Sequence, residues 1–296
     1  MKPTMTWLFP IWTIIWKAAL FFFLWGTLLA PFIVPFSASL PEFQRTFPLQ
    51  MRLLFDLASA FSILAAAWIM TRFVDRRSFL SLGFAPRQMI RDLPLGLGLG
   101  AAWLMLSVTV CWLASWILPK PPSAFSGSVL VWAGVALFFN TLAQEVLTRS
   151  YIFQTIQSQT NATAAIIVSA FMFMTYHAGA YQGSWLPAFN VFAAGILFGV
   201  AYHLTGNLWL PIGIHFVWNF LLGPVLGLAV SGQNLLSSGR AMFTVQGPAL
   251  FTGGSFGLEG GLVVTFTTVI GIVVLLLSLR PQKANNGMHR TRFARR

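Results

Sequence analysis

The chain has 296 residues, of which 57% are hydrophobic and only 8% are charged. Because soluble domains carry about 25% charged residues, this composition excludes a water-soluble globule and predicts a polytopic membrane protein. The formal net charge is +12, from 18 Lys and Arg against 6 Asp and Glu. In a membrane protein such an excess is typical of cytoplasmic loops and tails rather than of a nucleic-acid partner. The single cysteine, Cys111, excludes an intramolecular disulfide framework.

Apolar runs of membrane-spanning length follow one another along the chain. They predict an all-α, polytopic membrane helix bundle with about eight transmembrane helices. The first run is longer than the apolar region of a signal peptide, so we expect it to remain as a span. The fifth and sixth runs are short or interrupted by polar residues, as expected of helices that line a protein interior. The runs cover residues 18–36, 49–70, 93–118, 128–153, 162–177, 187–204, 208–230 and 260–279.

The basic residues predict the orientation. The loop after the second run and the C-terminal tail lie on the same side of an eight-span protein and hold most of the cations. By the positive-inside rule we expect both termini in the cytoplasm. We expect the protein itself to lie in the plasma (inner) membrane of a bacterium. We expect residues 280–296 to be a disordered tail that contacts anionic lipid headgroups, and the Gly- and Ser-rich loop 231–259 to be mobile. The cations of the two segments are Arg72, Arg76, Arg77, Arg87, Arg91, Arg280, Lys283, Arg290, Arg292, Arg295 and Arg296.

The long stretch between Asp92 and Glu259 contains a single acidic residue, Glu145. This residue lies within a predicted transmembrane helix. An ionisable group inside the bilayer costs about 2.5–3.5 kcal/mol on insertion scales, so Glu145 is the first candidate for function. Arg149 follows one helical turn later and can pair with it. Gln144 adds an amide that forms hydrogen bonds but is no base at neutral pH.

Two histidines also fall inside predicted spans. His177 shares a helix face with Phe173, and His215 shares one with Asn219. Counted from the turn near residues 158–161, Glu145 and His177 both lie on the order of 20 Å deep, and His215 lies on the order of 10 Å from the same side. We therefore expect all three to meet in one cavity. An acid, two imidazoles and an amide can activate water and stabilise an oxyanion, which favours amide hydrolysis.

These motifs resemble those of the CPBP family of membrane peptidases, which includes CAAX prenyl proteases and bacteriocin-processing (Abi-type) enzymes. The family pattern is EExxxR, then FxxxH, then HxxxN or HxxxD. Three such motifs in this order on membrane helices are fairly specific, although each pair alone is weak. In this chain they read Gln144-Glu145-Val-Leu-Thr-Arg149, Phe173-Met-Thr-Tyr-His177 and His215-Phe-Val-Trp-Asn219.

The resemblance implies a domain organisation and a role for each motif residue. Residues 128–222 would be the catalytic core, preceded by N-terminal transmembrane helices with the basic cytoplasmic loop (1–127), and followed by the outer loop and last transmembrane helix (223–279) and the basic tail (280–296). His177 would hold water, and His215 with Asn219 would stabilise the oxyanion. Glu145 and Arg149 would form a supporting pair. The implied substrate is a membrane-associated peptide or protein.

The chain departs from the family pattern at Gln144, where the family has the glutamate usually given the water-activating role. One hypothesis is that Glu145, about 100° around the helix, takes over this role. The alternative is a catalytically inactive relative that binds a membrane peptide or partner protein through the same cavity. A transporter is a third class, which the absence of inverted repeats and the single buried acid argue against.

A metal cofactor is a separate question. Glu145, His177 and His215 make up a His₂Glu set of the kind found at catalytic zinc, although the HExxH spacing is absent. A zinc-bound histidine commonly passes its other N–H to a carboxylate, carbonyl or water, and the sequence offers no further acid in this region. We therefore expect no required cofactor, with a divalent metal such as zinc as the alternative.

Overall fold

The computed structural model describes residues 8–34, 49–121, 127–181, 183–233 and 242–280. Helices dominate this part of the chain, and one short pair of strands joins two loops. The predicted tail lies outside it except for the first residue, Arg280. The helices are α1 (Leu8–Ile33), α3 (Leu49–Ile69), α4 (Pro86–Leu113), α5 (Gly127–Arg149), α6 (Tyr151–Gln159), α7 (Ala162–Tyr176), α8 (Trp185–Thr205), α9 (Trp209–Phe220), α10 (Ala249–Thr252) and α11 (Leu262–Ser278), and the strands are β1 (Ile117–Pro119) and β2 (Phe243–Val245).

Five helical segments are long and apolar enough to cross a membrane, among the residues that the structure describes. Three further apolar helices are shorter, namely Ala162–Tyr176, Trp209–Val225 and Leu262–Ser278. Each of the predicted apolar runs overlaps one of these helices, so the all-α class is confirmed, while a count of about eight spans stays a prediction. The five long segments are Leu8–Ile33, Met51–Val74, Phe79–Leu113, Gly127–Gln159 and Trp185–Thr205.

The structure corrects the predicted elements at several places. The run 93–118 ends in β1, which pairs antiparallel with β2, because the chain leaves α4 through a turn at Ser115, where φ is 57°. The run 128–153 is interrupted at Ser150, which separates α5 from α6. The loop that we expected to be mobile contains β2, α10 and two 3₁₀ turns, Gly254–Phe256 and Leu258–Gly260.

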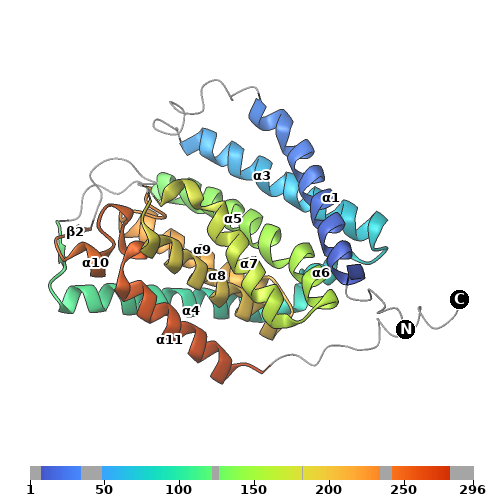
Figure 1. The fold of residues 1–296 in the computed structure, drawn as a ribbon. Helices are drawn as coiled ribbons and strands as arrows, with labels where there is room; N and C mark the ends of the chain where they lie inside the picture. Colours follow the sequence, from blue (N-terminus) through green and yellow to red (C-terminus); the bar gives the residue numbers. More distant parts are fainter. Residues whose placement is uncertain (1–7, 35–48, 122–126, 182, 234–241, 281–296) are drawn as a thin grey trace, which may run out of the picture.

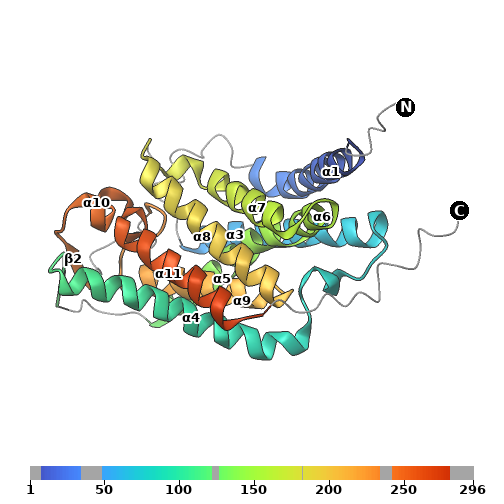
Figure 2. The same ribbon diagram turned by 60° about the horizontal axis from the view of Figure 1, so that its bottom comes forward.

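The helices pack side by side with their loops at the two ends (Figure 1). α1 lies against α3 on one flank, and α4 lies against α9 and α11 on the other. β2 and α10 lie at one end of the bundle, while the connection from α3 to α4 lies at the opposite end (Figure 2). The basic connection and the outer loop therefore lie at opposite ends of the bundle, and which end faces the cytoplasm stays a prediction.

Two glycines allow α4 to approach α9 closely. A Cβ on Gly96 would lie 2.5 Å from the carbonyl oxygen of Leu210, and one on Gly100 would lie 2.4 Å from that of Ile214. Small residues four positions apart are a common device for close helix contact in membranes. The contact determines the position of α9, and with it that of His215.

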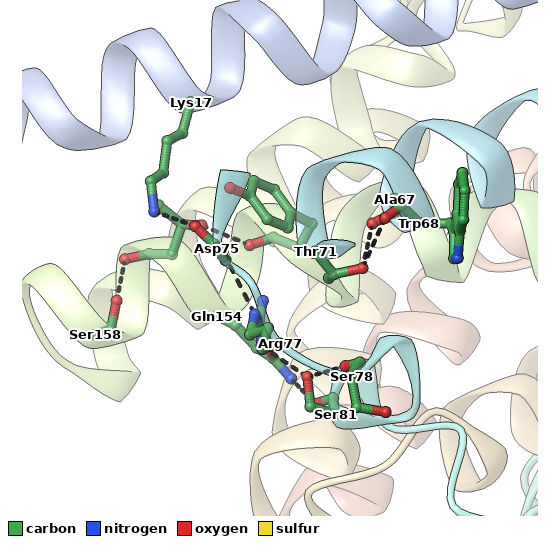
Figure 3. A network of polar contacts seen from close by, with 12 residues as sticks. Lys17, Ala67, Trp68, Thr71, Asp75, Arg77, Ser78, Ser81, Gln154 and Ser158 are labelled. Atoms are coloured by element: carbon green, nitrogen blue, oxygen red, sulfur yellow. Dashed lines mark hydrogen bonds and ion pairs between the residues drawn. The ribbon is translucent and has the colours of Figure 1, made fainter. Parts of the chain in front are cut away.

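Polar contacts tie α1 and α6 to the basic connection (Figure 3). Lys17 Nζ of α1 lies 2.5 Å from Asp75 Oδ1. Arg77 donates to Gln154 of α6, and Gln154 Nε2 donates to the Tyr202 hydroxyl of α8 at 2.6 Å. Lys17, which lies before the first predicted span in the sequence, is thus inside α1 and paired at the basic end of the bundle.

Candidate active site

A small cavity lined by aromatic and polar side chains lies between α4, α7, α8, α9 and the loop before α11. Its volume is about 40 Å³, enough for about three water molecules. Trp103, Phe173, Phe198 and Trp218 supply its aromatic wall. The polar residues that line it are His177, Asn190, His215, Asn219, Ser231 and Glu259.

His177 lies directly after the last residue of α7, where it is the C-terminal cap. Its Nδ1 lies 2.8 Å from the carbonyl oxygen of Phe173. Because a carbonyl can only accept, Nδ1 carries the proton and donates. In the neutral ring the other nitrogen, Nε2, is then the acceptor. The sequence placed His177 within the fifth helix, whereas the structure places it at the end of α7, bordering the cavity.

His215 of α9 is held by the carboxylate that the sequence singled out. Its Nδ1 lies 2.8 Å from Glu145 Oε1, and Glu145 is fully buried. The ring of Phe198 stacks on the imidazole with centroids 4.9 Å apart. The carboxylate accepts a hydrogen bond from Nδ1–H, so the pair fixes the orientation of the His215 ring.

Arg149 is the buried cation that pairs with Glu145. Its Nη1 lies 3.4 Å from Glu145 Oε1, and its Nη2 donates to the carbonyl oxygen of Gly195 at 3.1 Å. The guanidinium also lies over the rings of Phe173 and Phe198, 4.5 and 5.3 Å from their centroids. Cation–π contact and a carboxylate together compensate a charge that would be costly to bury alone.

Gln144 does not border the cavity. Its Nε2 donates to Asn140 Oδ1 at 2.6 Å, and Asn140 Nδ2 donates to Asp56 Oδ1 of α3 at 2.8 Å. Asp56 also pairs with Arg52 at 3.7 Å, the structural pair that their spacing suggests. The side chains of Gln144 and Glu145 thus point to different parts of the core, because adjacent residues of a helix are about 100° apart.

The predicted site residues therefore fall into three groups. His177, His215 and Asn219 line the cavity. Glu145 and Arg149 lie behind His215, and Gln144 lies on the side of α3. The expected meeting of the three ionisable motif residues holds for the two histidines, whereas Glu145 reaches the cavity only through His215.

Sequence reasoning missed Glu259, which also lines the cavity. Its Oε1 accepts from Trp218 Nε1 at 2.8 Å, and its Oε2 accepts from the backbone N–H of Ser231. Burial raises the pKa of the Glu259 carboxyl, against the lowering effects of these two donors and of nearby His215. The view that Glu145 is the one carboxylate available to the core is thus wrong. The only signal in the sequence was an acid directly before the last apolar run.

The donor atoms do not fit the proposed His₂Glu metal set. Glu145 Oε1 is occupied by His215 Nδ1 and Arg149. Among the residues described, no group of three or more His, Cys, Asp or Glu side chains has the geometry to hold a metal ion.

The fold and the cavity define an apolar helical protein with a polar, histidine-lined site in its interior. Residues 126–221 match the family described as Type II CAAX prenyl endopeptidase Rce1-like. The chain thus contains a domain of this family, which is the CPBP family that the three motifs resemble, and the resemblance is confirmed. No curated protein and no solved structure matches the chain.

Proposed function

We propose that the protein is an intramembrane endopeptidase of the CAAX-protease or bacteriocin-processing type, embedded by about eight spans. The observation that carries the proposal is the arrangement of two oriented imidazoles, His177 and His215, and the amide of Asn219 around one water-sized cavity. Membership of a family of CAAX prenyl endopeptidases supports it.

The two histidines have different chemical roles. His177 has committed Nδ1–H to a backbone carbonyl, so its Nε2 accepts a hydrogen bond from the attacking water. His215 has a carboxylate at Nδ1, so in its protonated form it donates from Nε2. Together with Asn219 it stabilises the oxyanion of the tetrahedral intermediate.

An apolar chain on the substrate has a place next to this site. A second cavity of about 170 Å³ lies between α4, α8, α9 and α11, with an almost wholly apolar lining. Trp103 borders both cavities. The adjacent apolar space supports a membrane-associated peptide or protein as the substrate, with its hydrophobic part beside the polar site.

Replacement of the cavity histidines tests the function. We expect His177→Ala and His215→Ala each to lower kcat by about 10²- to 10⁴-fold, as is typical when a group that handles a proton is lost. The assay uses purified protein in detergent. The probe is a fluorogenic peptide with a farnesylated C-terminal CAAX sequence, and its unprenylated counterpart is assayed beside it. His203→Ala is the matched control, because His203 contacts Gln157 and does not line the cavity. Full activity in both folded cavity variants would show that the site is wrong.

A catalytically inactive relative is the second candidate. Its support is Gln144, which replaces the family's first glutamate and is hydrogen-bonded toward Asp56 through Asn140. The same assay discriminates the two functions. Robust cleavage by the natural sequence rules out the inactive relative, whereas retention of the farnesylated peptide without cleavage favours it.

A further inference from the structure

The cavity has a carboxylate that the family motifs do not supply. Glu145 is fully buried behind His215, and Gln144 is turned toward α3. Glu259, which follows the outer loop, borders the same small cavity as His177 and His215. Its carboxyl group therefore faces the same small space as the two imidazoles and the Asn219 amide.

The Glu259 carboxylate is held in place but keeps acceptor capacity. Trp218 Nε1 donates to one oxygen at 2.8 Å, and the Ser231 N–H donates to the other. A carboxylate has about four acceptor sites, so about two remain for water. Trp218 directly precedes Asn219 in α9, and its ring stacks on Trp103 with centroids 3.8 Å apart. The helix that carries the motif histidine thus also positions Glu259.

The backbone around Glu259 is hydrogen-bonded to α8. Asn190 Nδ2 donates to the carbonyl oxygens of Glu259 and Gly261 at 2.8 and 2.9 Å. Thr265 donates to Asn190 Oδ1 at 2.6 Å. Gly257, with φ of 89°, provides the left-handed bend before this turn. A side chain held by such surrounding contacts is preorganised for a defined task.

Two imidazoles border the cavity together with Glu259. His215 lies near it and has Glu145 at its Nδ1. His177 borders the same cavity from α7. His215 therefore contacts the Glu145 carboxylate directly and shares the lining of the cavity with Glu259.

We propose that Glu259 is the catalytic carboxylate of this protein and takes the role that its family assigns to the position of Gln144. The inference rests on the proposed peptidase function. A cavity water donates one hydrogen bond to His177 Nε2 and the other to Glu259. Glu259 takes that second proton while the electron pair of the broken O–H bond forms the bond to the carbonyl carbon, and the carbonyl π pair moves to its oxygen. When the C–N bond breaks, the proton passes from Glu259 to the leaving amine, so the carboxylate is regenerated.

The Glu259→Gln variant tests the role, with the farnesylated peptide as probe. We expect kcat to fall by about 10²- to 10³-fold with KM changed by less than about threefold, because proton transfer is lost while the cavity shape is kept. We expect Glu259→Asp to retain more activity than Glu259→Gln, since it keeps a carboxylate. Asp92→Asn is the matched control, because this buried acid pairs with Arg91 and Asn207 outside the cavity, and its kcat should stay near that of the wild type.

The outcomes separate the two proposals. Cleavage by the wild type and by Glu259→Gln with equal kcat per folded molecule overturns the role of Glu259 alone. A variant that only melts at a lower temperature, with unchanged kcat, overturns it as well and assigns Glu259 to structure. A wild-type chain that cleaves no probe overturns the peptidase proposal, and the role of Glu259 with it.

Discussion

The side chains around the cavity are oriented by hydrogen bonds and ring contacts with one another. Phe173 illustrates this: its carbonyl oxygen accepts from His177, while its ring lies under Arg149 and edge-on to His215. One residue thereby contributes to the orientation of both imidazoles and to the burial of a cation. The motif phenylalanine is therefore more than a packing residue in this protein.

The Glu145–Arg149 pair predicts a large stability effect at the residue scale. Glu145→Gln leaves the fully buried Arg149 without its anion, so we expect the free energy of unfolding to fall by about 3–5 kcal/mol. Denaturant unfolding in detergent micelles measures it. The control is Arg52→Gln, which breaks the more exposed i,i+4 pair with Asp56 and should cost less. Equal losses in the two variants would contradict a special role for the buried pair.

At the scale of elements, the position of α9 depends on how closely α4 approaches it. α9 carries His215 and Asn219 of the site as well as Trp218, the partner of Glu259. The glycines of α4 set the separation, and the Cβ of any other residue at Gly96 or Gly100 would overlap a backbone oxygen of α9. The geometry of the site thus depends on helix packing some distance from it in sequence.

Substitution of one glycine tests this packing. We expect Gly100→Ala to lower Tm and activity, because the new methyl would lie 2.4 Å from the Ile214 carbonyl oxygen and would push α9 away. Gly98→Ala on the open face of the same helix meets nothing within 4 Å. We expect it to raise Tm slightly, since alanine favours a helix by about 1 kcal/mol over glycine. Thermal unfolding followed by circular dichroism measures Tm for both variants. Equal Tm values would show that α4 and α9 are farther apart at Gly100 than in this structure.

At the scale of the whole molecule, the two ends of the bundle differ in charge and in construction. At one end, the connection from α3 to α4 carries Arg72, Arg76 and Arg77, and the start of α4 carries Arg87 and Arg91. The opposite end is closed by β1, β2 and α10, which bring the loop with Ser231 and Glu259 over the cavity. If the basic end faces the cytoplasm, the turn that carries Glu259 lies on the outer side.

Cysteine labelling in intact bacterial cells tests this topology. In a Cys111→Ser background, we expect Thr244→Cys in β2 to react with a membrane-impermeant maleimide, because both positive-inside bias and the antiparallel order of the helices place it outside. Arg87→Cys should react only after the membrane is permeabilised. Both positions are exposed in the structure, so access to the reagent depends on the membrane. The reverse pattern would show that the orientation is wrong.

Hydropathy indicated one helix for each apolar run, because a stretch of chain in lipid must satisfy its own backbone hydrogen bonds and so becomes helical. The first and third long segments nevertheless begin well before their predicted runs, at Leu8 and Phe79. Hydropathy could not locate the break at Ser150 or the pairing of β1 with β2, since both depend on how distant segments meet. The motif spacing predicted a shared face for His215 and Asn219, which both lie in α9, because i,i+4 residues share a helix face. It could not predict that α7 ends just before His177.

The sequence by itself determined the all-α class, the order of the long apolar helices and the three motifs with their family. Only the tertiary structure decided which side chains reach the cavity. It turned Gln144 toward Asp56, placed Glu145 behind His215 and brought Glu259 to the site. The physical reason is that local patterns follow from backbone hydrogen bonding and hydrophobicity along one element. The set of groups around a cavity depends instead on packing between elements that are far apart in the chain.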